Sequence, residues 1–242
     1  VTSGTQGETG YYRSNVTVRI SGSDATSPLK KVTYRVTGTA KGANGKGTVA
    51  NTTVTENQTI DTGEVEIANN GTIQIQADGI WTVTAYAFDV SGRKSAVSGS
   101  LVFTRDTVGP VINSFIIETL AYSSSTGNGT ATVTASDALS GVGTTSTTYT
   151  YYLANTNKGT SASNSFAYTE INIDNIPKVT AKDKAGNTSD AVTLNKVKVV
   201  NFDYVGAVQS LKILTTGRYK LQVWGAEGGT NSSSSWGGYR RI

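Results

Sequence analysis

Five aspartates are the residues in this sequence whose type and placement best fit a binding site. Each stands at the end of an expected strand or in the connector between two halves of the chain. Carboxylates and loop carbonyls gathered at one junction are what a six- to eight-coordinate Ca²⁺ site needs. The alternative is that each aspartate caps a turn by accepting hydrogen bonds from nearby backbone N–H groups. The five aspartates are Asp24, Asp89, Asp106, Asp137 and Asp183.

Four tyrosines form a second candidate site. Tyr149, Tyr151 and Tyr152 lie close together in one expected strand, and Tyr168 lies in a strand that can face it. Exposed tyrosine rings stack on sugars and their hydroxyl groups form hydrogen bonds, so these four residues are candidates for binding a glycan. The alternative is that the same tyrosines pack against each other as cross-strand pairs.

The sequence contains no His and no Cys. It therefore lacks the usual ligands of zinc, copper and haem, and it cannot form a His-dependent catalytic triad. A Ser–Lys dyad would remain, but nothing in the sequence distinguishes one serine as a nucleophile. We expect no enzyme activity, and Ca²⁺ is the only cofactor that the residue types suggest.

The charge and hydropathy of the chain argue against two classes of partner. The net charge is +4 and the basic residues are dispersed, whereas a nucleic-acid-binding surface needs contiguous positive charge. The longest apolar run is much shorter than the roughly 20 residues of a membrane span. We expect neither nucleic-acid binding nor membrane insertion.

Alternating apolar and polar residues indicate the elements that must position these side chains. Val16, Val18 and Ile20 alternate with polar residues, as do Ile73 and Ile75. This period of two gives a strand one buried face and one solvated face. Thr, Val, Ile and Tyr favour strands, while Gly, Asn, Asp and Ser favour turns. The sequence predicts an all-β protein, with a core position for Trp81 and tight turns at Asn44-Gly45, Asn70-Gly71 and Asn128-Gly129.

An internal repeat indicates two domains of similar size. The pattern Asp-x-small-Gly-x-x-Ser begins at Asp89 and again at Asp183, 94 residues later. This spacing is close to the roughly 100 residues of an immunoglobulin-like sandwich. Ser-Asp-Ala likewise occurs at Asp24 and at Asp137. The interval from Asp24 to Asp89 is about 19 residues longer than its counterpart, which predicts an inserted hairpin region at about 38–77.

The repeat sets the expected domain boundaries. The first sandwich is predicted at residues 1–108 and the second at 109–199, with a connector around Pro110 that fixes the local backbone. Residues 200–242 are predicted to begin a third β domain.

The motifs of the first two domains resemble the immunoglobulin-like repeats of large bacterial surface proteins. The resemblance covers roughly residues 10–198 and implies two tandem immunoglobulin-like β-sandwiches. The boundary is similar to the Asp-Thr-x-x-Pro junctions that separate such repeats. The residues that carry it include Gly10-Tyr11-Tyr12, Ser23-Asp24-Ala25, Trp81 to Asp89, Asp106-Thr107-Val108-Gly109-Pro110 and Asp183 to Asn187.

The segment after residue 200 carries the most specific signature. Tyr219 to Gly229 reads Tyr-Lys-Leu-Gln-Val-Trp-Gly-Ala-Glu-Gly-Gly. It resembles the start of the glycine-rich domain of bacterial surface proteins and of certain receptor tyrosine kinase ectodomains. That family continues well beyond this point, so 200–242 is expected to be a truncated N-terminal part.

These resemblances imply a function and two alternatives. The first is a stalk or spacer segment of an extracellular bacterial cell-surface or secreted protein, whose partners are the neighbouring domains of a longer chain. The first alternative is an adhesin module that binds a host glycan or extracellular-matrix protein. The second is a structural component of a phage or extracellular filament. Related adhesin modules carry isopeptide bonds between a buried Lys and an Asn or Asp, formed beside a carboxylic acid with a raised pKa. Lys31 and Glu170 are conceivable members of such a site, and the alternative is that they are ordinary surface residues.

Overall fold

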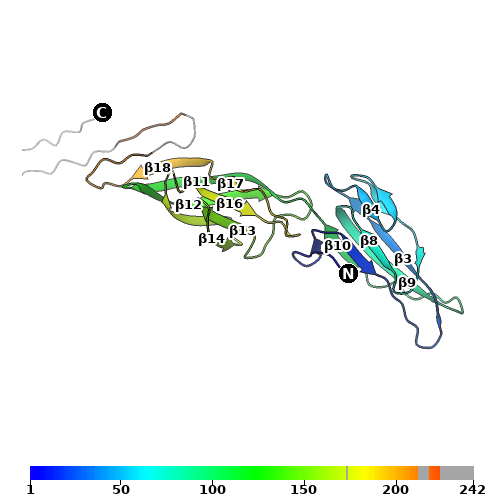
Figure 1. Ribbon diagram of the computed structural model, residues 1–242. Helices are drawn as coiled ribbons and strands as arrows, with labels where there is room; N and C mark the ends of the chain where they lie inside the picture. Colours follow the sequence, from blue (N-terminus) through cyan, green and yellow to red (C-terminus); the bar gives the residue numbers. More distant parts are fainter. Residues whose placement is uncertain (173, 212–217, 224–242) are drawn as a thin grey trace, which may run out of the picture. The chain divides into compact units, whose positions relative to one another are not determined.

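The computed structural model describes residues 1–172, 174–211 and 218–223, and this part of the chain consists of strands and loops without a helix (Figure 1). The predicted all-β fold is confirmed. Residues Val1–Leu211 form one compact unit and Lys212–Ile242 a second. No helix in the described part of the chain is long and apolar enough to cross a membrane.

Sandwich 1 consists of two facing sheets. One follows the order β1-β10-β9-β3-β6, with β7 also paired to β3, and the other follows β2-β8-β4-β5. Its strands are β1 (Tyr11–Tyr12), β2 (Val16–Arg19), β3 (Leu29–Ala40), β4 (Gly47–Val49), β5 (Thr52–Val54), β6 (Thr59–Asp61), β7 (Val65–Ile67), β8 (Thr72–Ile75), β9 (Gly79–Asp89) and β10 (Leu101–Arg105).

Sandwich 2 has an immunoglobulin-like strand distribution. Its first, second, fifth and eighth strands share one sheet, in the order β15-β12-β11-β18, and the second sheet follows β14-β13-β16-β17. Its strands are β11 (Val111–Ser123), β12 (Thr126–Ser136), β13 (Tyr149–Leu153), β14 (Thr156–Ser161), β15 (Ser165–Ile171), β16 (Pro177–Ala181), β17 (Val192–Thr193) and β18 (Lys196–Phe202).

Each sandwich buries its own hydrophobic core between its sheets. In sandwich 1 the alternating residues of β2 and β8 are buried as predicted, and Trp81 is fully buried with its indole N–H donating to the Ala77 carbonyl at 3.1 Å. The stretch 38–77, predicted as an inserted hairpin region, supplies β4, β5 and β8 of one sheet. Val49 and Ile75 from this stretch are fully buried, so it forms part of the core.

One predicted turn is wrong. Asn128-Gly129 lies inside β12 rather than in a turn, and the hairpin between β11 and β12 turns at Ser124, whose φ is 58°. The Asn128 side chain accepts the Glu170 N–H at 3.2 Å where β15 is irregular. A Cβ at Gly129 would lie 3.0 Å from the Ile117 side chain, so this glycine permits close packing within the sheet.

The second sandwich ends later than the boundary expected at residue 199. β18 continues to Phe202, whose ring packs edge-on against Tyr122 with centroids 5.2 Å apart. Leu211 also packs against the second core. The end of the glycine-rich signature, from Trp224 onward, lies outside the described residues.

Candidate functional site

The repeated Asp-x-small-Gly-x-x-Ser motif forms the same loop in both sandwiches. The Asp89 carboxylate accepts the Arg93 N–H at 2.8 Å, and the Asp89 N–H donates to the Arg93 carbonyl at 3.1 Å. Asp183 and Asn187 form the same two bonds at 2.8 and 3.1 Å. Both aspartates therefore cap their loops, as the turn explanation of this motif requires.

The two aspartates of the Ser-Asp-Ala motif also cap loops. Asp24 accepts the N–H groups of Thr26 and Ser27 at 2.8 and 2.7 Å. Asp137 accepts those of Leu139 and Gly141 at 3.0 and 2.8 Å. Asp24 is exposed, whereas Asp137 is half-buried because other residues of the junction lie against it.

The connector between the sandwiches is anchored to sandwich 1 through Asp78, which is 1% exposed. The Arg105 guanidinium forms an ion pair with one carboxylate oxygen of Asp78. Its second terminal nitrogen donates to the Asn15 side-chain oxygen at 2.9 Å. The backbone N–H and hydroxyl of Thr107 donate to the other Asp78 oxygen at 3.0 and 2.7 Å. Arg105 and Thr107 of the connector thus both bind the buried carboxylate of Asp78.

The residue between them, Asp106, is anchored to sandwich 2. It is 1% exposed. One carboxylate oxygen accepts the Ser140 N–H at 3.0 Å, and the other accepts the N–H of Val108 at 3.0 Å. The Asn187 side-chain amide donates to the Asp106 carbonyl at 2.9 Å. Alternate side chains of the connector therefore hold opposite sandwiches.

Asp106 meets Asp137 and Asp183 in a carboxylate cluster in which one oxygen of each residue lies within 4.8 Å of one oxygen of the other two. Burial and the neighbouring charge of Asp137 raise the pKa of Asp106, and hydrogen bonds from Val108 and Ser140 lower it, so that the pKa lies at about 6. Burial also raises the pKa of Asp183. Like charges at this spacing disfavour full ionisation, so the cluster favours a bound proton or a bound cation.

The cluster contains three of the five aspartates predicted as Ca²⁺ ligands. Asp106, Asp137 and Asp183 come together, whereas Asp24 and Asp89 lie in the loops of sandwich 1 and outside this cluster. Three carboxylates match the oxygen preference of a hard cation. Both oxygens of Asp106 and both of Asp183 already accept N–H hydrogen bonds, which a capping role explains on its own. Ca²⁺ binding stays a prediction.

Two further residues reach across the junction, and no sequence motif marks either. The Glu8 carboxylate accepts the N–H and the hydroxyl of Thr144 at 2.6 and 2.8 Å. The Arg13 guanidinium donates to the Gly186 carbonyl at 2.6 Å. A Cβ at Gly7 would lie 2.3 Å from the Lys184 carbonyl oxygen, so the backbones touch here. Only the repeat at Gly186 gave a sequence signal for this contact.

Of the four tyrosines proposed either as a glycan-binding platform or as packing pairs, at least two lie in the core. Tyr149 and Tyr168 are 7% and 3% exposed. The Tyr151 ring stacks on Phe166 at 4.8 Å between centroids and lies edge-on to Tyr168 at 6.0 Å. Tyr152 is half-buried. Burial raises the pKa values of Tyr149 and Tyr168, and the cross-strand packing explanation accounts for the group.

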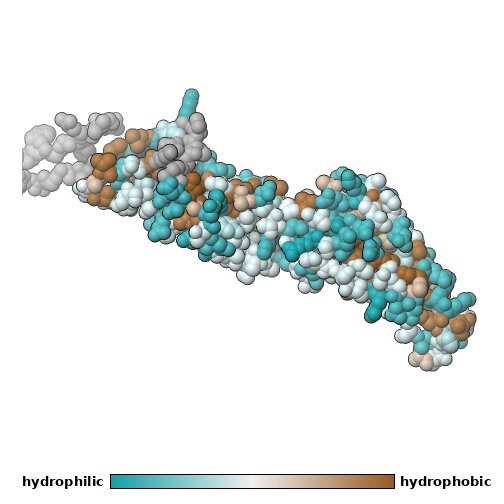
Figure 2. Space-filling view, viewed as in Figure 1, coloured by the Kyte–Doolittle hydropathy of each residue, from teal (hydrophilic) through white to brown (hydrophobic). Residues whose placement is uncertain are grey.

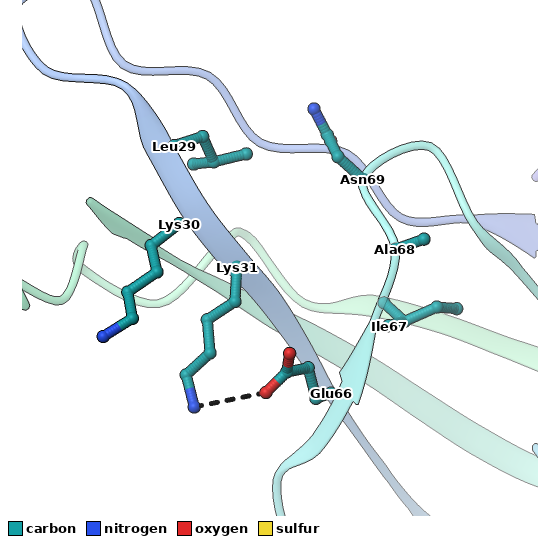
Figure 3. A pocket seen from close by; sticks show the side chains of 7 residues that line it. All are labelled: Leu29, Lys30, Lys31, Glu66, Ile67, Ala68 and Asn69. Carbon is teal, nitrogen blue, oxygen red and sulfur yellow. Dashed lines mark ion pairs between the residues drawn. The ribbon is translucent and has the colours of Figure 1, made fainter. Parts of the chain in front are cut away.

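A shallow groove of about 540 Å³ lies beside β3 and β7 of sandwich 1 (Figure 3). Lys31 forms an ion pair with Glu66 at 3.4 Å across it. Lys31 and Glu170 lie in different sandwiches, so the structure does not bring these two conceivable members of an isopeptide site together. The lining residues are Leu29, Lys30, Lys31, Glu66, Ile67, Ala68 and Asn69.

The chain matches no protein-family model and no curated protein. Among solved structures, it is similar to fibronectin(III)-like modules of Clostridium thermocellum CbhA, at 14% identity and a TM-score of 0.38, over 82% of this chain and 93% of that one. It is also similar to a chimeric titin Z1Z2-Z1Z2 tandem functionalized with a GRGDS peptide from fibronectin, at 12% identity and a TM-score of 0.25, over 83% of this chain and 97% of that one. Similarity at this level carries no conclusion about function.

Proposed function

We propose that this chain is a non-enzymatic spacer segment of a bacterial cell-surface or secreted protein, which holds neighbouring domains of a longer chain at a set separation. A spacer needs modules that are stable by themselves and a connector that resists bending. The sandwiches meet the first requirement, since each has its own core.

The connector is the observation that carries the proposal. Arg105 and Thr107 bind the buried Asp78 of sandwich 1, while Asp106 binds the loops of sandwich 2. Bonds from one tripeptide to both modules leave few backbone torsions free to rotate. Glu8 and Arg13 add polar contacts on the same junction. A flexible linker would be rich in Gly and Ser and would make no such bonds.

The surface features favour a spacer over an adhesin. The tyrosines expected to bind a glycan are largely buried. The groove beside β3 is shallow and is crossed by an ion pair. On the face shown in Figure 2, hydrophobic residues gather in separate patches between hydrophilic ones rather than in one broad area. Large contiguous apolar patches are the usual mark of a binding face.

Distance measurements between the sandwiches test the proposal. The chain has no native Cys, so Thr72→Cys on β8 and Thr160→Cys on β14, both exposed, provide unique positions for spin labels. We expect one narrow distance distribution in double electron–electron resonance. The control carries Asp106→Gly and Thr107→Gly, which remove the carboxylate bonded to sandwich 2 and the hydroxyl bonded to sandwich 1 and make both backbone positions more flexible, and it should give a broader distribution. A wild-type distribution as broad as that of the control would contradict the spacer function.

A further inference from the structure

The loop end of sandwich 1, defined as residues 24–28 and 89–95, shares its loop-closing bonds with the loop end of sandwich 2, residues 137–141 and 183–189. The two loops are tied by Val90 N–H to Pro28 at 3.0 Å in the first case, and by Lys184 N–H to Gly141 at 3.0 Å in the second. The positive φ angles of Gly92 and Gly186 agree at 86° and 90°, as do the loop-closing bonds of Asp89 and Asp183. In sandwich 2, this end receives Asp106 of the connector.

The loop end of sandwich 1 differs from its counterpart in charge. Arg93 stands where sandwich 2 has Asn187, and it is exposed. Hydrogen bonds from Ser27 and Thr26 lower the pKa of Asp24, and the positive charge of Arg93 lowers it further. Lys30, also exposed, lies two residues after the 24–28 segment and lines the groove shown in Figure 3. At position 93 this end therefore offers a cation where the corresponding residue of the internal junction, Asn187, offers a neutral amide.

The connector motif also occurs twice. Asp106-Thr107-Val108-Gly109 follows β10, and Asp203-Tyr204-Val205-Gly206 follows β18 at the corresponding place in sandwich 2. Asp203 is exposed, and its carboxylate has no hydrogen-bond or ion-pair partner in the described part of the chain. Tyr204 is 95% exposed. The second copy of the motif thus presents an unpaired carboxylate and a free aromatic ring.

We propose that the Asp203–Gly206 segment of one copy of this chain docks onto the loop end of sandwich 1 in a second copy. The carboxylate of Asp203 pairs with Arg93, in the place where the Asn187 amide binds the connector within one chain. Tyr204 lies against the apolar part of the groove, formed by Leu29 and Ile67, near Lys30. The contact joins copies end to end, which extends a spacer without a new type of junction.

Sedimentation velocity of the full 242-residue chain over a wide concentration range at low salt tests this docking. The wild type should show a sedimentation coefficient that rises with concentration, and added salt should weaken the association because exposed charges are screened. Arg93→Glu and Asp203→Arg should each weaken it about tenfold, since each places like charges together. The chain that carries both changes restores opposite charges and should associate like the wild type.

Asp190→Arg is the matched control, because Asp190 is exposed and lies outside both segments. It should leave association unchanged. Circular dichroism checks that each variant is folded, and Arg93→Gln with Asp203→Asn replaces any charge reversal that is not. A wild type that stays monomeric at every concentration would overturn the proposal. Association that survives both single changes, or that the double change fails to restore, would overturn it equally.

Discussion

Replacing Asp106 by asparagine should remove a specific part of the pH dependence of stability. Burial raises the pKa of Asp106 from 3.8 to about 6 in the folded chain. Between these values the folded state binds more protons than the unfolded state, so this group's contribution to stability falls as pH rises from about 4 to about 6. A shift of about two pH units corresponds to about 3 kcal/mol. Asp183, whose pKa is also raised, acts in the same direction.

Other carboxylates act in the opposite direction, so the prediction concerns a difference between two proteins. The Arg35 side chain lowers the pKa of Asp61 to about 2, which adds stability as pH rises. This contribution is common to the wild type and Asp106→Asn and cancels on subtraction. The difference in their unfolding free energies should therefore change by up to about 3 kcal/mol between pH 4 and pH 7, in favour of the asparagine variant at the higher pH.

Urea denaturation followed by circular dichroism at pH 4, 5, 6 and 7, in the presence of EDTA, measures this difference. Asp190→Asn, an exposed carboxylate, is the control and should track the wild type at every pH. A constant difference between wild type and Asp106→Asn across the series would refute the reasoning. Repeating the series with millimolar CaCl₂ tests the predicted cation site, because an ion bound by the carboxylate cluster stabilises the wild type but not the variant.

Three further predictions concern other parts of the fold. Asp78→Ala leaves the buried Arg105 charge without its partner and should cost about 3–5 kcal/mol, whereas Asp78→Leu with Arg105→Met should recover most of it; urea denaturation measures both. Tyr151→Ala removes a stacked ring and should lower the melting temperature of sandwich 2 while leaving a glycan array silent; a glycan signal lost in this variant alone would restore the adhesin function. Under pulling force, sandwich 2 should unfold at higher force than sandwich 1, because six parallel residue pairs join β11 to β18 and only two join β1 to β10; single-molecule force spectroscopy that finds the opposite order would contradict this.

The sequence predicted the strands well where apolar residues alternated and where a residue had one suitable environment. Val16, Val18 and Trp81 lie in the core for this reason. The turn predicted at Asn128-Gly129 is wrong because glycine is suited both to turns and to close packing between strands. Here the close packing against β11 requires the glycine, and this cannot be read from the sequence. The sequence left open whether the tyrosines are exposed or buried, because a strand pattern does not reveal which of the two faces of the strand is covered by the other sheet.

The aspartates of the candidate site could be predicted from the sequence, but the other residues that bond across the junction could not. The repeat and the connector motif identify Asp106, Asp137 and Asp183, which meet in space. Nothing in the sequence separates these three from Asp24, since that depends on which loops face the junction. Glu8 carries no signal, because its partner Thr144 lies 136 residues away and neither belongs to a motif.

The alternation of anchors along the connector limits how such modules can be rearranged. Successive side chains of an extended connector point to opposite sides, so one residue inserted between Arg105 and Asp106 would turn each later side chain toward the other sandwich. A change in the length of the connector therefore disturbs every anchor after it, whereas a change of one residue type disturbs one anchor. A recombination that cuts between two sandwiches would also separate Asp106 from the loops that cap it. An exchanged module therefore keeps this junction only if it supplies the same anchor, which is a buried carboxylate like that of Asp78 on one side and a backbone N–H like that of Ser140 on the other.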